Sequence, residues 1–169
     1  MSENTGILFK KGDLVAYPTN GIGKITEIVD KVIFGKTMTY YNIFFPSQNM
    51  NILLPVQNAE ETGLRALASE EEIRAAVASL SVERKVKEAD WKTRQLKQMT
   101  LMKEGSIENI ALIVNILYHR QKVRDLPIQE RRIFDTALQQ LTDETRCVLG
   151  MEEDKVRRAI FTRLEKIGK

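Results

Sequence analysis

The segment RALASEEEIRAAVASL (residues 65–80) contains the point at which the chain changes from one regular pattern to another. Ser69, followed three residues later by Glu72, is a capping box, the pattern with which many helices begin. Ile73 and Val77 then start an apolar series at helical spacing. The segment therefore predicts that the chain is α-helical from here onward, whatever precedes it.

The residues before this segment have the pattern of a small β domain. Short runs rich in β-branched and aromatic residues alternate with turn signals, and residues 21–23 are expected to lie in a turn. The expected strands cover residues 13–17, 23–33, 37–45 and 50–54. Roughly four or five short strands cannot form a two-sheet sandwich, so we expect a small, strongly bent barrel. Its core is expected to take up the aromatic residues Tyr17, Tyr40, Tyr41, Phe44 and Phe45.

The remainder of the chain has the pattern of a helical bundle. Ser106 precedes one apolar helical pattern, Pro127 suits the first turn of the next, and Gly105 and Gly150 are placed to end helices. A last helix is expected over residues 152–167. The predicted fold class is α+β, with a small β-barrel followed by a helical bundle. The expected domains are a flexible tail over residues 1–8, the barrel over 9–65 and the helical domain over 70–169.

Trp91 is the only tryptophan, and its neighbours along the chain are charged. Two helix positions fit this region: residues 82–102, or a helix that begins at Trp91 with Asp90 as its cap. In either case the indole points away from an apolar stripe that includes Leu96. The stripe is Val82, Val86, Ala89 and Leu96 in the first case and Leu96, Met99 and Met102 in the second.

The charges around the tryptophan are mostly positive. The net charge is +3 with a pI near 9.0, and the basic excess lies after residue 64, most densely from Arg84 to Lys103. Cations can contact phosphates while an aromatic ring wedges between bases, so this surface favours a polyanionic partner, nucleic acid above all. A buried tryptophan and a merely solvated basic helix remain open as alternatives.

Several classes of protein are disfavoured by what the sequence contains. Cys147 and His119 are the only cysteine and histidine, so an internal disulfide, most zinc sites and most histidine-based catalytic pairs are excluded. We expect no cofactor, no metal and no enzymatic activity. No apolar run is long enough for a membrane span, and the first residues do not resemble a signal sequence. We therefore expect a cytoplasmic protein that does not bind membranes.

Several motifs together resemble the CarD family of bacterial transcription regulators. The N-terminal motifs are residues 9–18, Gly21-Ile22-Gly23, residues 54–59 and Gly63-Leu64-Arg65. In the helical half, Trp91 to Arg94 and the following Gly105 reproduce the family's spacing. The opening motif alone also resembles the polymerase-binding domain of transcription-repair coupling factors. The resemblance extends over nearly the whole chain from Phe9 onward.

This resemblance implies a fold and a mechanism. A Tudor-like barrel would dock on the β subunit of bacterial RNA polymerase, and the bundle would contact promoter DNA at the upstream edge of the transcription bubble. Trp91 would enter the distorted minor groove there. The protein would act as a monomer, reach the nucleoid through the polymerase, and bind DNA largely without sequence preference. The DNA-contacting residues are expected to be Trp91, Arg94, Lys92, Lys97, Lys87 and Arg84.

The sequence departs from the family pattern at several positions. On the polymerase side Lys31 matches a basic family position, but Leu53 replaces another, which suggests a more apolar patch of Lys31, Ile52 and Leu53. On the DNA side Arg94 matches, whereas Thr93 and Leu96 stand where relatives often have basic residues. The neighbouring Lys92 and Lys97 are expected to compensate for the lost phosphate contacts. A protein-interaction adaptor, with a bundle that binds a second protein instead of DNA, is the alternative function.

Overall fold

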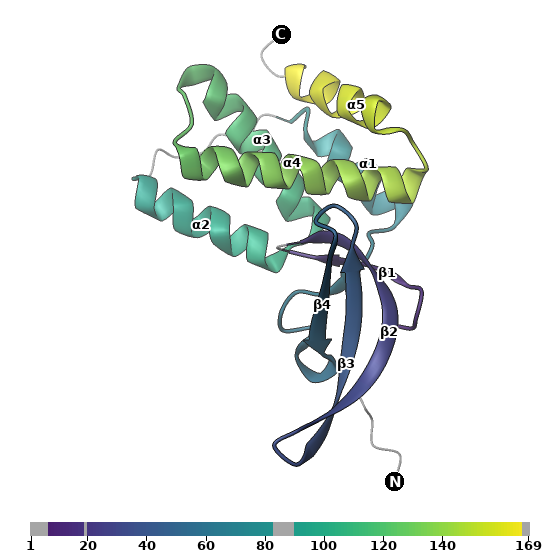
Figure 1. Ribbon diagram of the computed structural model, residues 1–169. Helices are drawn as coiled ribbons and strands as arrows, with labels where there is room; N and C mark the ends of the chain where they lie inside the picture. Colours follow the sequence, from purple (N-terminus) through teal and green to yellow (C-terminus); the bar gives the residue numbers. More distant parts are fainter. Residues whose placement is uncertain (1–6, 19, 83–89, 167–169) are drawn as a thin grey trace. The chain divides into compact units, whose positions relative to one another are not determined.

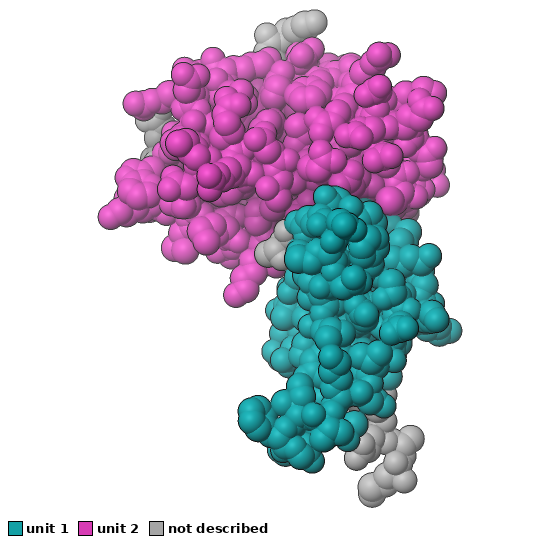
Figure 2. All heavy atoms as spheres, viewed as in Figure 1, with its two compact units in different colours: residues 1–67 teal, residues 68–169 magenta. Residues whose placement is uncertain are grey.

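The computed structural model describes residues 7–18, 20–82 and 90–166 of the chain. These residues form two compact units, residues 1–67 and 68–169, which Figure 2 shows in different colours. Each unit has a hydrophobic core of its own. A five-stranded antiparallel sheet comes first and five α-helices follow in the described part of the chain (Figure 1), which confirms the α+β class.

The sheet has the strand order β4-β3-β2-β1-β5, so β4 and β5 lie at its two edges. Its strands are β1 (Leu14–Tyr17), β2 (Gly21–Ile33), β3 (Lys36–Phe45), β4 (Met50–Pro55) and β5 (Arg65–Ala66), and the 3-10 helix η1 (Val56–Asn58) follows β4. The pairing of β2 with β3 shifts between Ile25 and Glu27, and such an irregularity increases the bend of a sheet. The strong curvature of β2 in Figure 1 agrees with the predicted Tudor-like barrel.

Residues 21–23 do not form the predicted turn, because they are the first part of β2. Gly23 pairs with Val15 of β1. A Cβ atom at position 23 would lie 2.6 Å from Cγ2 of Ile43 and 2.7 Å from Cε1 of Phe45. Glycine is therefore needed at position 23 for the close packing of the core against the strand, and sequence alone could not separate this role from a turn.

The aromatic residues of β3 divide between the two faces of this strand. Tyr41 and Phe45 are fully buried, whereas Tyr40 and Phe44 are only half-buried. Successive side chains of a strand point to opposite faces, so alternate residues alone can enter the core. The expectation that all five aromatic residues fill the core is therefore too broad. The Tyr41 hydroxyl also accepts a hydrogen bond of 2.9 Å from the backbone N–H of Leu8.

The second unit consists of helices whose ends agree with the sequence signals. The helices are α1 (Glu70–Ser79), α2 (Trp91–Glu104), α3 (Ile107–Val123), α4 (Ile128–Leu149) and α5 (Glu153–Glu165). Ser69 accepts the backbone N–H of Glu72 at 3.1 Å, which confirms the predicted capping box. Gly105 and Gly150 follow α2 and α4 in the left-handed conformation, as expected of helix-ending glycines.

A buried carboxylate fixes the place where the chain enters the second unit. Glu144 of α4 is 2% exposed and accepts a hydrogen bond of 2.7 Å from the backbone N–H of Ala68. Ala68 also belongs to the core that the helices share. The first residue of the unit is thus held by a polar contact across 76 positions of sequence as well as by apolar packing.

Candidate nucleic-acid interface

Trp91 is the first residue of α2, and its position is set by the helix cap before it. Asp90 has an extended backbone, and its Oδ1 accepts the backbone N–H of Thr93 at 2.8 Å. This confirms the shorter of the two predicted helices, while residues 83–89 lie outside the described part. Trp91 is 56% exposed, so the predicted outward orientation is confirmed and the indole does not belong to the core of the helical unit.

The predicted cations of this surface have different surroundings. Lys92 places its Nζ 5.7 Å from the centroid of the Trp91 ring, close enough for a cation–π contact. Lys97 is exposed on the same helix. Arg84 and Lys87 lie outside the described residues. Among the described residues, the cation that the structure brings to the indole is therefore Lys92, and Lys97 lies exposed six residues after Trp91 on α2.

Arg94 is not a free surface cation. Its side chain is 13% exposed, and its Nε donates a hydrogen bond of 3.0 Å to Oε1 of Glu130. Glu130 lies in the first turn of α4, and its side chain is 4% exposed. Arg94 does follow the tryptophan by three residues, but the charge of its guanidinium group is paired with the Glu130 carboxylate inside the helical unit. A contact of Arg94 with a phosphate stays a prediction, and it would have to compete with this ion pair.

The predicted apolar stripe of α2 is wrong at two positions. Leu96 is 69% exposed and Met99 is 56% exposed, whereas Gln98 is buried at 7%. The inward face begins with Arg94 and Gln98 and becomes apolar only at the end of the helix. Because a polar contact to another helix sets this rotation, the apolar periodicity of α2 alone assigns the wrong face.

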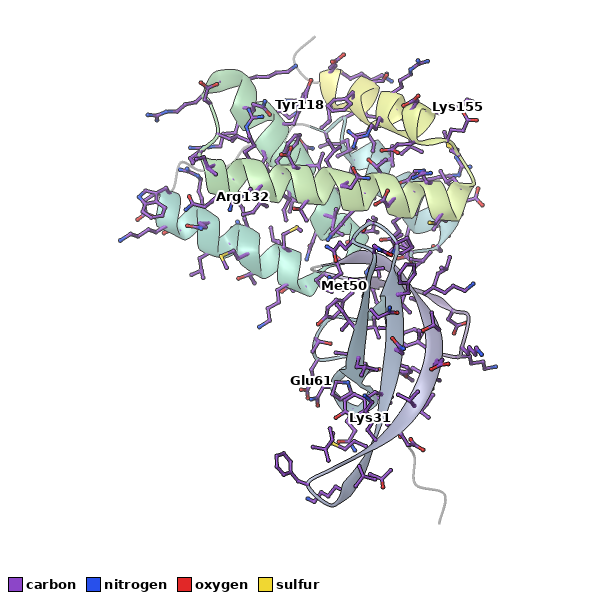
Figure 3. All side chains as sticks on the ribbon, viewed as in Figure 1. Lys31, Met50, Glu61, Tyr118, Arg132 and Lys155 are labelled. Atoms are coloured by element: carbon purple, nitrogen blue, oxygen red, sulfur yellow. The ribbon has the colours of Figure 1, made fainter. Side chains whose placement is uncertain are left out.

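The structure adds basic residues that the sequence analysis did not include. Arg131 and Arg132 are exposed and follow Glu130 directly, in the part of α4 to which the Arg94 pair ties α2. Figure 3 labels Arg132 near the beginning of α4. Lys122 and Arg124 at the end of α3 are also exposed. The arginine pair at 131–132 is visible in the sequence. It lies 40 residues after Trp91, so the sequence alone did not indicate that α4 packs beside α2.

The predicted polymerase-contacting residues lie on the sheet of the first unit. Lys31, which Figure 3 labels on the sheet, is an exposed residue of β2, and Leu53 is 41% exposed on the edge strand β4. Ile52 is half-buried and packs against the barrel core, so little of it remains for a partner. The β2–β3 hairpin adds a residue that the sequence analysis missed: Phe34 is fully exposed and has a positive φ of 52°.

The described residues include no cluster of three or more His, Cys, Asp and Glu side chains that could hold a metal ion. Among the helices that the structure describes, none has both the length and the apolar character needed to cross a bilayer. Cys147 is an exposed residue of α4, and partial desolvation of its thiol raises the pKa above its ordinary value.

Comparison with known proteins places both units in one family. Residues 9–68 match the family model described as the CarD-like/TRCF RID domain, and residues 75–161 match the model of the CarD C-terminal domain. The chain is also 23% identical over 150 residues to the Bacillus subtilis protein named "Putative transcription factor YdeB", across 89% of this chain and 98% of that protein. The two domain matches cover most of both units, and the CarD C-terminal model alone spans more than half of the chain, so the chain belongs to the CarD family.

Proposed function

We propose that this protein is a non-enzymatic regulator that docks on the β subunit of RNA polymerase and stabilises the open promoter complex through Trp91. The family supports a transcription-related role. Its N-terminal domain is of a kind that interacts with RNA polymerase. The observation that carries the finer proposal is the half-exposed indole at the start of α2, beside the Lys92 ammonium. An exposed tryptophan is costly to leave in water and suits a binding surface.

The mechanism depends on a difference in affinity between two forms of DNA. Unwinding unstacks a base at the edge of the bubble, and an indole placed there contacts the open form better than the closed duplex. Stacking of about 1 to 3 kcal/mol shifts the open-complex population by about five- to a hundred-and-fifty-fold. The effect requires no bond to be made or broken.

The surrounding cations supply the part of DNA binding that is independent of sequence. Lys92 and Lys97 on α2 and Arg131 on α4 are exposed, and they can neutralise phosphates of the DNA that Trp91 contacts. Few base-reading side chains lie among them. Promoter choice would therefore come from the polymerase.

The polymerase contact is proposed for the sheet. The edge strand β4 can add to a strand of a partner, with the exposed Leu53 beside the pairing edge. Lys31 and Phe34 extend the surface along β2 and the hairpin that follows it. This surface exposes Leu53 and Phe34 beside the cation Lys31, so we expect apolar contacts to contribute more to docking than salt bridges do.

The test measures open-complex lifetime with purified polymerase on a responsive promoter, after a challenge with competitor. The wild-type protein should lengthen the lifetime, and Trp91→Ala should remove most of this effect. Lys155→Ala, an exposed change on α5, is the control and should behave as wild type. A Trp91→Ala protein that stabilises the open complex as well as wild type contradicts the proposal.

One observation favours a second function, that of an adaptor between proteins. Lys92, Leu96, Met99 and Lys103 follow one another at spacings of four, three and four, so they share an exposed face of α2 with an apolar centre. Such a face suits a protein surface with acidic edges. Salt-dependent DNA binding by the isolated protein supports the regulator, and the lack of any such binding supports the adaptor.

A further inference from the structure

Glu130 lies where three helices of the second unit meet. Its Oε1 accepts hydrogen bonds from Nε of Arg94 at 3.0 Å and from Nε2 of Gln98 at 3.2 Å, both on α2. Nε of Arg120, on α3, lies 3.7 Å from its Oε2. One carboxylate of α4 thus contacts both neighbouring helices.

These contacts tie Arg94 and Gln98 of α2 to the other helices. Apolar packing on the shared core comes from Leu101 and Met102, near the end of the helix. Leu96 and Met99 are exposed and contribute little to that packing. Arg94 and Gln98 lie about one and two turns after Trp91, so a buried polar contact fixes the end of α2 that carries the indole.

A buried carboxylate is strongly sensitive to the loss of its partners. Removing one member of a buried ion pair leaves the other charge without compensation in a medium of low polarity. The two guanidinium groups and the amide around Glu130 therefore restrict where the start of α2 can lie. The same pairing matches the charge of Arg94 inside the unit, away from the exposed lysines.

We propose that Glu130 is a positioning residue, which holds the first turn of α2 so that Trp91 meets DNA in a fixed orientation. This inference rests on the proposed function and adds a role for a residue that does not touch DNA. It also assigns Arg94 to the support of the tryptophan and not to a phosphate. The phosphate contacts on α2 are then left to the lysines.

The change Glu130→Gln tests the inference with little change of shape. If the oxygen of the new amide still accepts from Arg94 and Gln98, the amide nitrogen takes the place of Oε2 beside Arg120, and the negative charge that compensates both guanidinium groups is lost. Because Trp91 is the only tryptophan, its fluorescence anisotropy reports on the start of α2 in the free, full-length protein. We expect lower Trp91 anisotropy in Glu130→Gln than in wild type. The open-complex lifetime should be shorter by about five-fold, which is the smallest effect expected when one stacked aromatic ring is lost.

Glu144→Gln is the matched control. It alters another buried carboxylate of the same helix, one that accepts the backbone N–H of Ala68. It should lower the unfolding temperature, yet leave the anisotropy of Trp91 and the lifetime of the open complex at wild-type values. A loss of both readouts in Glu144→Gln as large as in Glu130→Gln would show a general stability effect and overturn the inference.

A second variant covers the case in which Glu130→Gln does not fold. Arg94→Gln removes the charged partner of Glu130 on α2 and leaves Glu130 with Gln98 and Arg120, so it should fold and still reduce the anisotropy. Its DNA binding should keep the salt dependence of wild type, whereas Lys92→Gln should reduce it. A lower salt dependence in Arg94→Gln means that Arg94 contacts phosphate, which overturns its assigned role.

The double variant with Trp91→Ala separates this inference from the proposed function. If Glu130 acts through the indole, Glu130→Gln should have no further effect on open-complex lifetime in a Trp91→Ala background. An additive loss overturns the inference. If Trp91→Ala alone has no effect, the proposed function fails. If Trp91→Ala acts while folded Glu130→Gln and Arg94→Gln match wild type in anisotropy and lifetime, only the positioning role fails.

Discussion

The Oδ1 atom of Asp90 accepts the backbone N–H of Thr93 at 2.8 Å, and this hydrogen bond makes Trp91 the first residue of α2. An aspartate in this place satisfies one of the donors that a helix start leaves unpaired, and its negative charge is favoured by the helix dipole. Hydrogen bonds from the Thr93 side chain and backbone hold the pKa of Asp90 below its ordinary value. The cap and the candidate DNA contact are therefore adjacent in sequence and coupled in structure.

The lowered pKa predicts an acid-sensitive start of α2. The stabilising contribution of the cap is fully present above the unfolded pKa of about 3.9 and is lost as pH falls through the lower pKa of the folded state. Trp91 anisotropy should therefore fall in this acid range. Asp90→Asn retains a good cap that does not titrate, so it should lack the transition. An identical transition in Asp90→Asn, with unchanged far-UV circular dichroism, would assign it to another group.

Trp91→Ala should cost little stability. Truncating a fully buried tryptophan to alanine lowers the free energy of unfolding by about 3 to 5 kcal/mol. Trp91 is 56% exposed, so we expect a clearly smaller loss. Urea unfolding followed by circular dichroism measures the difference. Leu117→Ala, at a position with no exposure, should lose about 2 to 5 kcal/mol in the same assay. Similar losses in the two variants would show that the tryptophan is structural.

Leu96→Lys should strengthen DNA binding by the full-length protein. Leu96 is 69% exposed, so a lysine is tolerated there, and it adds a cation to the exposed face of α2 that carries Lys92 and Lys103. One added phosphate contact should make the slope of log K against log salt steeper by about 0.9. Leu96→Gln controls for the loss of the apolar side chain. An unchanged slope in Leu96→Lys would place this face of α2 away from DNA and favour the protein-adaptor function.

The sequence was sufficient for features that depend on neighbouring residues, and insufficient for those set by distant ones. The capping box at Ser69 could be predicted, and the start of α2 at Trp91 was one of two positions that the sequence allowed, because each depends on a few adjacent residues. The pairing of Arg94 with Glu130 joins residues 36 positions apart, and no local pattern encodes it. That pairing rotates α2, which is why Leu96 is exposed against the apolar periodicity.

Gly23→Ala should destabilise the barrel. The new Cβ would lie 2.6 Å from Cγ2 of Ile43, and both residues belong to paired strands that cannot separate without loss of core contacts. Overpacking of this kind costs about 1 to 3 kcal/mol. Lys24→Ala, the next residue and an exposed one, should have a much smaller effect. Equal unfolding midpoints for the two variants and wild type would mean that the strand moves aside easily.

The two units should fold and bind separately. The buried residues divide into one cluster within the sheet unit and another within the helical unit, so neither core needs the other. A fragment of residues 1–67 should keep its sheet and bind the polymerase β subunit. A fragment of residues 68–169, which retains the bond between Ala68 and Glu144, should keep salt-dependent DNA binding without polymerase affinity. Circular dichroism verifies folding before either binding assay. A folded sheet fragment that does not bind the β subunit would contradict the docking proposal and leave the DNA-contact proposal intact.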